Sequence, residues 1–161
     1  MKIKFSTAIV AVIIVLFSSN ILSYDQQMAD SYYRLFQPVA GAKAGKALHL
    51  MPPDVFIESI KQGKQLVTLD VRTPAESGIY SMTLPGSLAI QISELFKFNN
   101  LQKLPTDKPL VIVCLSGVRA TAAGTALRHI GFNNVYILKG GFKGLTGYLD
   151  PKVANMPAKA K

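Results

Sequence analysis

The chain has 161 residues, of which 49% are hydrophobic and 17% charged, so we expect one globular domain with an appended segment rather than two domains or extensive disorder. The formal net charge is +9, but the basic residues occur singly and without interleaved aromatic residues, so no nucleic-acid-binding surface is predicted. This positive charge is expected either to attract small anions or to serve solubility alone.

The first 23 residues have the pattern of an export signal. Lys2 and Lys4 precede an apolar run over residues 8–17, which polar residues follow. We therefore interpret residues 1–23 as a signal peptide or an N-terminal membrane anchor, and we expect an exported protein that is periplasmic or associated with the cell envelope. The apolar run is shorter than the ~20 residues that a spanning helix needs, which favours removal or a simple membrane tether through residues 5–22.

Residues 24–47 are predicted to form a helical arm and a linker. Helical spacing is shown by four apolar residues, namely Met28, Tyr32, Leu35 and Phe36. Pro and Gly then interrupt residues 37–46, as is typical of a linker. A globular domain is expected over residues 48–150, and the Lys- and Ala-rich segment 151–161 is expected to be a flexible basic tail.

Helical and strand patterns alternate within the predicted domain. In chain order we expect a helix closed by Gly63, a strand over 66–71, an apolar stretch over 88–92, a short helix opened by Ser93, a strand over 110–113, a helix over 118–130 and a strand over 134–138. The strand over 110–113 is apolar at every position, as expected of a central strand covered on both faces. This alternation predicts a single α/β domain with a mainly parallel sheet and helices on both faces.

Cys114, the only cysteine, follows the predicted central strand and cannot form an internal disulfide. Ligands bind at this edge of an open α/β sheet. The next five residues lead into a helix, and amides of such a tight loop, with the helix dipole, stabilise an anion at the loop centre. We therefore expect a nucleophilic thiolate. Outside this context, a lone cysteine is more often a buried small hydrophobic residue.

Four motifs resemble those of the rhodanese family and follow in the same order. They are Leu69–Glu76, Leu84–Ser87, Cys114–Ala120 and Leu138–Phe142. The resemblance extends over about residues 51–142 and implies the rhodanese-like three-layer fold, an α/β fold with a mainly parallel five-stranded sheet flanked by helices. It also implies a sulfurtransferase activity that needs no metal and no organic cofactor.

The resemblance implies a role for each residue that matches the family's motifs. Cys114 would take sulfur from a donor such as thiosulfate and hold it as a persulfide, which a thiol or cyanide acceptor then removes. The cradle of the persulfide would be Leu115, Ser116, Gly117, Val118 and Arg119. Arg119 would also bind the anionic donor. Asp70 and Arg72 would either support the site or only form local hydrogen bonds at the end of a strand.

The loop and its surroundings refine this expectation. The arginine lies five positions after the cysteine, as in sulfurtransferases of this fold, whereas the related phosphatases and arsenate reductases have one residue more. Gly140 and Gly141 are expected to make a turn close to the site, and Phe142 to pack over it. The segment 78–86 lacks the histidine that the family often has there, which leaves the choice of acceptor open.

Two other functions remain open at this stage. The chain is consistent with a non-catalytic rhodanese module that carries sulfur or binds a partner protein in the cell envelope. It is also consistent with a redox thiol that forms mixed disulfides with a partner cysteine. The retention of Cys114, Gly117 and Arg119 argues against a domain without activity, but a sulfur carrier could keep all three.

Overall fold

A computed structural model describes residues 23–41, 46–154 and 156–157. The predicted leader lies outside this part of the chain, apart from Ser23, as does the whole of the predicted tether. Among the described residues, no helix has the length and apolar character required to span a bilayer.

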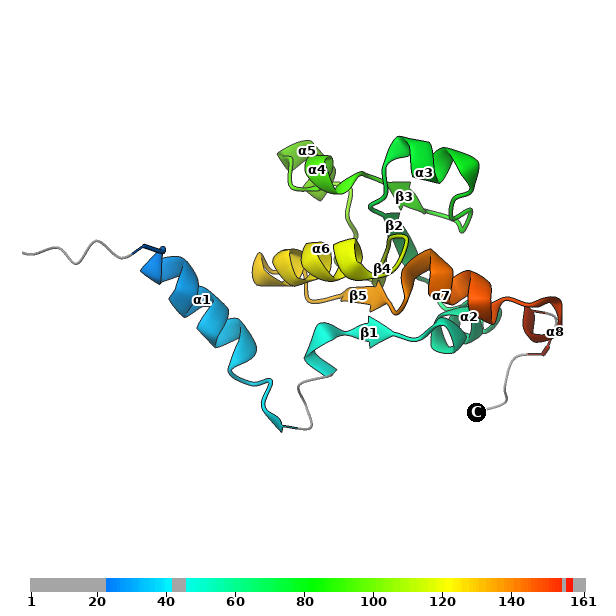
Figure 1. Ribbon diagram of the computed structural model, residues 1–161, viewed down its shortest axis with the longest axis horizontal. Coiled ribbons are helices and arrows are strands. Elements are labelled where there is room, and N and C mark those ends of the chain that lie inside the picture. Colours follow the sequence, from blue (N-terminus) through cyan, green and yellow to red (C-terminus); the bar gives the residue numbers. More distant parts are fainter. Residues whose placement is uncertain (1–22, 42–45, 155, 158–161) are drawn as a thin grey trace, which may run out of the picture.

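Helix α1 (Gln26–Phe36) lies in the arm, where the spacing of apolar residues predicts a helix. It contacts helix α6 (Val118–His129) at the end of α6 that is remote from Cys114 (Figure 1). The ring of Tyr32 stacks on that of His129, with the centroids 4.0 Å apart. Ser31 Oγ also lies 3.1 Å from His129 Nε2, so the arm contacts the domain at His129, away from the cysteine.

Five strands form one parallel sheet with the order β1-β5-β4-β2-β3. They are β1 (Leu50–Met51), β2 (Val67–Asp70), β3 (Leu88–Ala89), β4 (Leu110–Val113) and β5 (Val135–Leu138). Strand β4 is central, between β5 and β2. The predicted α/β fold with a parallel five-stranded sheet is thus confirmed. The pattern did not indicate β1, which is only two residues long.

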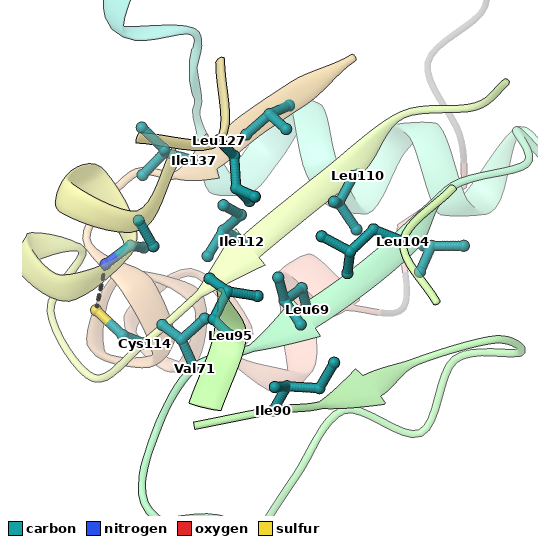
Figure 2. Close-up of a cluster of buried hydrophobic side chains, with 14 residues drawn as sticks. Leu69, Val71, Ile90, Leu95, Leu104, Leu110, Ile112, Cys114, Leu127 and Ile137 are labelled. Carbon is teal, nitrogen blue, oxygen red and sulfur yellow. Dashed lines mark hydrogen bonds between the residues drawn. The ribbon is translucent and has the colours of Figure 1, made fainter. Parts of the chain in front are cut away.

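Helices cover both faces of the sheet (Figure 1). One face carries α4 (Ile92–Leu95), α5 (Phe98–Leu101) and α6, and the other carries α2 (Pro53–Lys61) and α7 (Gly141–Tyr148). The sequence of β4 does not alternate because both of its faces are covered. Leu110 and Ile112 pack in the hydrophobic core on the α6 face (Figure 2), whereas Val111 and Val113 pack in the core on the face of α2 and α7. Each of these side chains is buried. A strand covered on both faces is apolar at every position.

Two segments differ from the expected pattern. Helix α7 begins at Gly141, where the sequence indicated only a turn, because the turn made by Gly140 continues directly into helix. The predicted loose tail begins with the short helix α8 (Pro151–Ala154), preceded by the carboxylate of Asp150, which accepts the N–H of Lys152 at 2.8 Å. Helix α3 (Pro74–Ile79) follows β2 in the chain.

Candidate active site at the end of the central strand

The pairing of β2 with β4 brings the predicted site residues together. Asp70 at the end of β2 lies opposite Val113 at the end of β4, and the N–H of Val71 donates to the carbonyl of Val113 at 2.9 Å. Both chains then leave the sheet at the same edge. Cys114 and Arg72 therefore begin neighbouring loops, although they are far apart in the sequence.

Main-chain amides point at the sulfur of Cys114. The N–H of Gly117 donates to Sγ at 3.1 Å and the N–H of Ala120 at 3.4 Å, the latter dashed in Figure 2. Gly117 caps α6 with a φ of +95°, a backbone conformation that residues with side chains rarely adopt. The sulfur thus lies in front of the first turn of α6, where amides have no partner within the helix.

The two amides coincide only partly with the predicted cradle, Leu115–Arg119. Gly117 belongs to it, whereas Ala120 lies one residue beyond. Sequence reasoning missed Ala120 because it treated the loop as the whole cradle. The signal was available, since the first four N–H groups of any helix lack intrahelical partners, and Ala120 is in that turn.

The thiol of Cys114 is also buried. The residue is 1% exposed and belongs to the same hydrophobic core as Val71 and Ile112 (Figure 2). The thiol is therefore both buried and contacted by amides. Neither a reactive thiolate nor a buried hydrophobic residue, the two alternatives from the sequence, describes Cys114 completely by itself. Exclusion of water strengthens the interaction between the amides and a charged sulfur, because the effective dielectric constant is low there.

Helix α7 holds the other side of the loop. The carbonyl of Cys114 accepts the N–H of Phe142 at 2.8 Å, and that of Leu115 accepts the N–H of Lys143 at 3.0 Å. Gly141 has a φ of +57°, and a Cβ at this position would lie 2.2 Å from the carbonyl oxygen of Cys114. The glycine pair is therefore next to the site, as the sequence indicates, and Gly141 is required by the close approach of two backbones.

Arg72 is buried, and each nitrogen of its guanidinium donates to a protein atom, with Nη1 3.4 Å from the carbonyl of Glu76. Its guanidinium contacts the Asp70 carboxylate through Nε and Nη2, with a shortest distance of 2.7 Å. Nη2 also donates to the carbonyl of Tyr80 at 2.6 Å, and Phe142 stacks with its ring centroid 3.8 Å from Cζ. Asp70 and Arg72 thus form local hydrogen bonds where the chain leaves β2.

Arg119 forms a two-pronged ion pair with Glu76 of α3. Nη1 lies 2.8 Å from Oε2 and Nη2 lies 2.5 Å from Oε1. This bond from Arg119, followed by those from Thr73, holds the pKa of the Glu76 carboxyl well below its usual range. The bond to Glu76 raises the pKa of Arg119, and Cys114 adds a smaller contribution in the same direction. Sequence reasoning assigned Arg119 to the donor and missed Glu76, which is 43 positions away.

No group of three His, Cys, Asp or Glu side chains is arranged to hold a metal ion within the part of the chain that the structure describes. The two histidines have other contacts. His49 Nδ1 lies 3.1 Å from the carbonyl of Val135, and His129 stacks on Tyr32.

Comparison with known proteins places the site in context. The sequence matches the family described as Rhodanese-like domain over residues 52–147. It is 35% identical over 94 residues to the mitochondrial thiosulfate sulfurtransferase RDL2 of Saccharomyces cerevisiae, covering 53% of this chain and 62% of RDL2. It is 33% identical over 93 residues to the thiosulfate sulfurtransferase GlpE of Pseudomonas syringae pv. syringae, covering 58% of this chain and 82% of GlpE.

A longer match is found in the probable adenylyltransferase/sulfurtransferase MoeZ of Mycobacterium tuberculosis, with 30% identity over 110 residues. It covers 68% of this chain but only 27% of MoeZ, so the chain spans about a quarter of that protein. Among solved structures, a rhodanese-related protein from Thermoplasma volcanium has a TM-score of 0.55 and 29% identity, covering 64% of this chain and 95% of that one. The human single-domain sulfurtransferase TSTD1, at a TM-score of 0.53 and 22% identity, covers 63% of this chain and 98% of its own, and supports the fold alone.

The close approach of α7 to the loop predicts the effect of adding one methyl group. Gly141→Ala should lower the free energy of unfolding by about 3 kcal/mol or more, because the new Cβ collides with the carbonyl of Cys114. Gly147→Ala in the same helix meets no atom within 4 Å and should change it by less than about 1 kcal/mol. Urea unfolding of both variants measures this, and equal effects would contradict the proposed contact.

The ion pair between Glu76 and Arg119 predicts a defined pH dependence. A carboxyl whose pKa is depressed by folding stabilises the protein fully above its unfolded pKa, near 4.5, and loses that contribution as the pH falls through the folded value. The difference in unfolding free energy between wild type and Glu76→Gln should therefore stay constant from about pH 7 to about pH 5.5 and shrink below the unfolded pKa. A difference that already shrinks near neutral pH would be inconsistent with the pair.

Proposed function

The chain belongs to the rhodanese-like family, and from this premise we propose that it is a sulfurtransferase that carries sulfane sulfur as a persulfide on Cys114. The observation that carries the proposal is the pair of amides, from Gly117 and Ala120, directed at Sγ. Amides at a helix N-terminus favour a thiolate over a thiol and would equally stabilise a persulfide anion. The names of RDL2 and GlpE, both thiosulfate sulfurtransferases, support the reaction class.

In the first half-reaction, the Cys114 thiolate attacks the outer sulfur of the donor. With thiosulfate, a new S–S bond forms to Sγ, the S–S bond of the donor breaks, and its electron pair leaves with sulfite. One negative charge therefore remains at the site, on the terminal sulfur of the persulfide. No general base is needed when the nucleophile reacts as a thiolate.

In the second half-reaction, an acceptor removes the terminal sulfur. A thiolate or cyanide attacks it, the bond to Sγ breaks, and the electron pair returns to Cys114 as the thiolate. The amides of Gly117 and Ala120 favour this step too, because the leaving group is the anion to which they donate in the free protein. The site would thus return to its initial state without an external proton or electron.

The burial of Sγ favours sulfur transfer over the formation of mixed disulfides. With Cys114 only 1% exposed, a partner must bring a narrow reacting atom to the sulfur. A sulfane donor has a terminal sulfur at its tip, whereas a cysteine within a partner protein brings bulky backbone with it. The geometry therefore supports a small sulfane donor as the first substrate.

We further propose that the protein is exported to the periplasm or the cell envelope, with residues 5–22 as the tether if the leader is retained. The support is the order of Lys2, Lys4, the apolar run and the polar residues after it. Fractionation of cells that express the full chain, with mass analysis of the amino terminus, should yield protein in the periplasm or membrane fraction. Full-length protein confined to the cytoplasmic fraction would contradict this proposal.

Intact-mass measurement tests the sulfur-carrying role of Cys114. Protein incubated with thiosulfate, and separately with a small-molecule persulfide, should gain the mass of one sulfur atom on Cys114 and lose it when cyanide is added. Cys114→Ala should remain folded and gain nothing. An unchanged mass of the wild type with both donors would refute the proposal, whereas stoichiometric loading with negligible turnover would identify a sulfur carrier rather than an enzyme.

A further inference from the structure

Both arginines beside Cys114 are neutralised by carboxylates of the same chain. Arg72 is paired with Asp70 at 2.7 Å, and the two side chains are only 1% and 3% exposed. Arg119 is paired with Glu76 through both of its terminal nitrogens. The main-chain amides therefore hold the sulfur, while the charges of these four side chains sum to zero before the thiolate is counted.

Glu76 is fixed more firmly than an ordinary surface acid. Besides Arg119, its Oε2 accepts the backbone N–H of Thr73 at 3.0 Å and the hydroxyl of Thr73 at 2.9 Å. Thr73 and Glu76 form the capping box at the start of α3, so the carboxylate is tied to a helix end. Arg119 and Glu76 remain 33% and 29% exposed, so the pair faces solvent on one side.

We propose that Glu76 is a specificity-determining positioning residue, which by neutralising Arg119 makes the site prefer singly charged sulfane donors over the thiosulfate dianion. This inference rests on the proposed sulfurtransferase function and names its donor class. With Cys114 as a thiolate, each additional negative charge on a donor is repelled and finds no free guanidinium to offset the repulsion. A singly charged donor, such as a thiosulfonate or a persulfide anion, carries one such charge fewer.

The exposed side chains of the loop agree with a donor that has an organic group. Leu115 is 36% exposed and Val118 is 73% exposed, and they lie on either side of Gly117 in the sequence of the loop. The surface of the loop therefore includes apolar side chains. Exposed lysines such as Lys143 attract anions of either charge through a field that salt screens, so they do not replace a bound guanidinium.

The transfer step with such a donor is balanced without a further reactant. The Cys114 thiolate attacks the terminal sulfur of a thiosulfonate, the new S–S bond forms at Sγ, and the S–S bond of the donor breaks. Its electron pair leaves with the sulfinate. Two negative charges enter the step, and two leave it, one on the persulfide and one on the sulfinate.

Thiosulfate and methanethiosulfonate form a matched pair of probes, because they differ only in one charged oxygen that is replaced by a methyl group. For the wild-type full chain with cyanide as the acceptor, kcat/KM should be higher for methanethiosulfonate than for thiosulfate. Glu76→Gln keeps a capping side chain, since Gln also serves in a capping box, but removes the charge that neutralises Arg119. In this variant the ratio of kcat/KM for thiosulfate to that for methanethiosulfonate should rise about fivefold.

Thr73→Ala is the matched control. It removes the capping hydroxyl while leaving the Glu76 carboxylate and Arg119 in place, so it should lower the melting temperature without changing the ratio between the two donors. A purely structural role for Glu76 would lower both rates equally and leave the ratio unchanged.

The outcomes separate this inference from the function on which it rests. If the wild type turns over but prefers thiosulfate, the inference is overturned while the sulfurtransferase proposal stays intact. The same holds if Glu76→Gln leaves the donor ratio unchanged. Wild-type protein that accepts sulfur from neither donor would refute both. If Glu76→Gln does not fold, a wild type that prefers thiosulfate still overturns the inference, because that result needs no variant.

Discussion

The chemistry of this site depends on the direction of two main-chain N–H groups. The amides of Gly117 and Ala120 point at Sγ of Cys114 only because the chain turns from β4 into α6 through a positive φ at Gly117. Helix α7 fixes this path from outside by donating to the carbonyls of Cys114 and Leu115. Main-chain amides do not need to reorganise when charge moves from one sulfur atom to the next. They therefore suit a sulfur anion that would be transferred between donor, protein and acceptor.

Side chains have a different task in this arrangement. Arg72 and Asp70 are paired with each other, and the Arg72 guanidinium stacks on the ring of Phe142. Arg119 is paired with Glu76, and both Glu76 and Cys114 raise the pKa of its guanidinium. The amides and the paired arginine are separate parts of the site, so on our proposals donor preference could change through Glu76 without loss of the amide contacts to Sγ.

Much of this arrangement could be predicted from the sequence, where the signal is local. The uninterrupted apolar run Leu110–Val113 identified the central strand, and the position of Cys114 after it indicated the candidate site. Strand β1 was missed because two residues show no periodicity, and α7 because glycines usually end helices rather than begin them. The pair between Arg119 and Glu76 could not be read at all, since only the packing of α3 beside the loop brings them together.

A crystal structure of the sulfur-loaded protein tests the central claim most directly. After incubation with a sulfane donor, the account predicts one added sulfur on Cys114 whose terminal atom lies within hydrogen-bonding distance of main-chain amides of the loop and the first turn of α6. A structure in which the added sulfur points away from those amides would contradict this claim. So would a structure in which the amides donate to other partners.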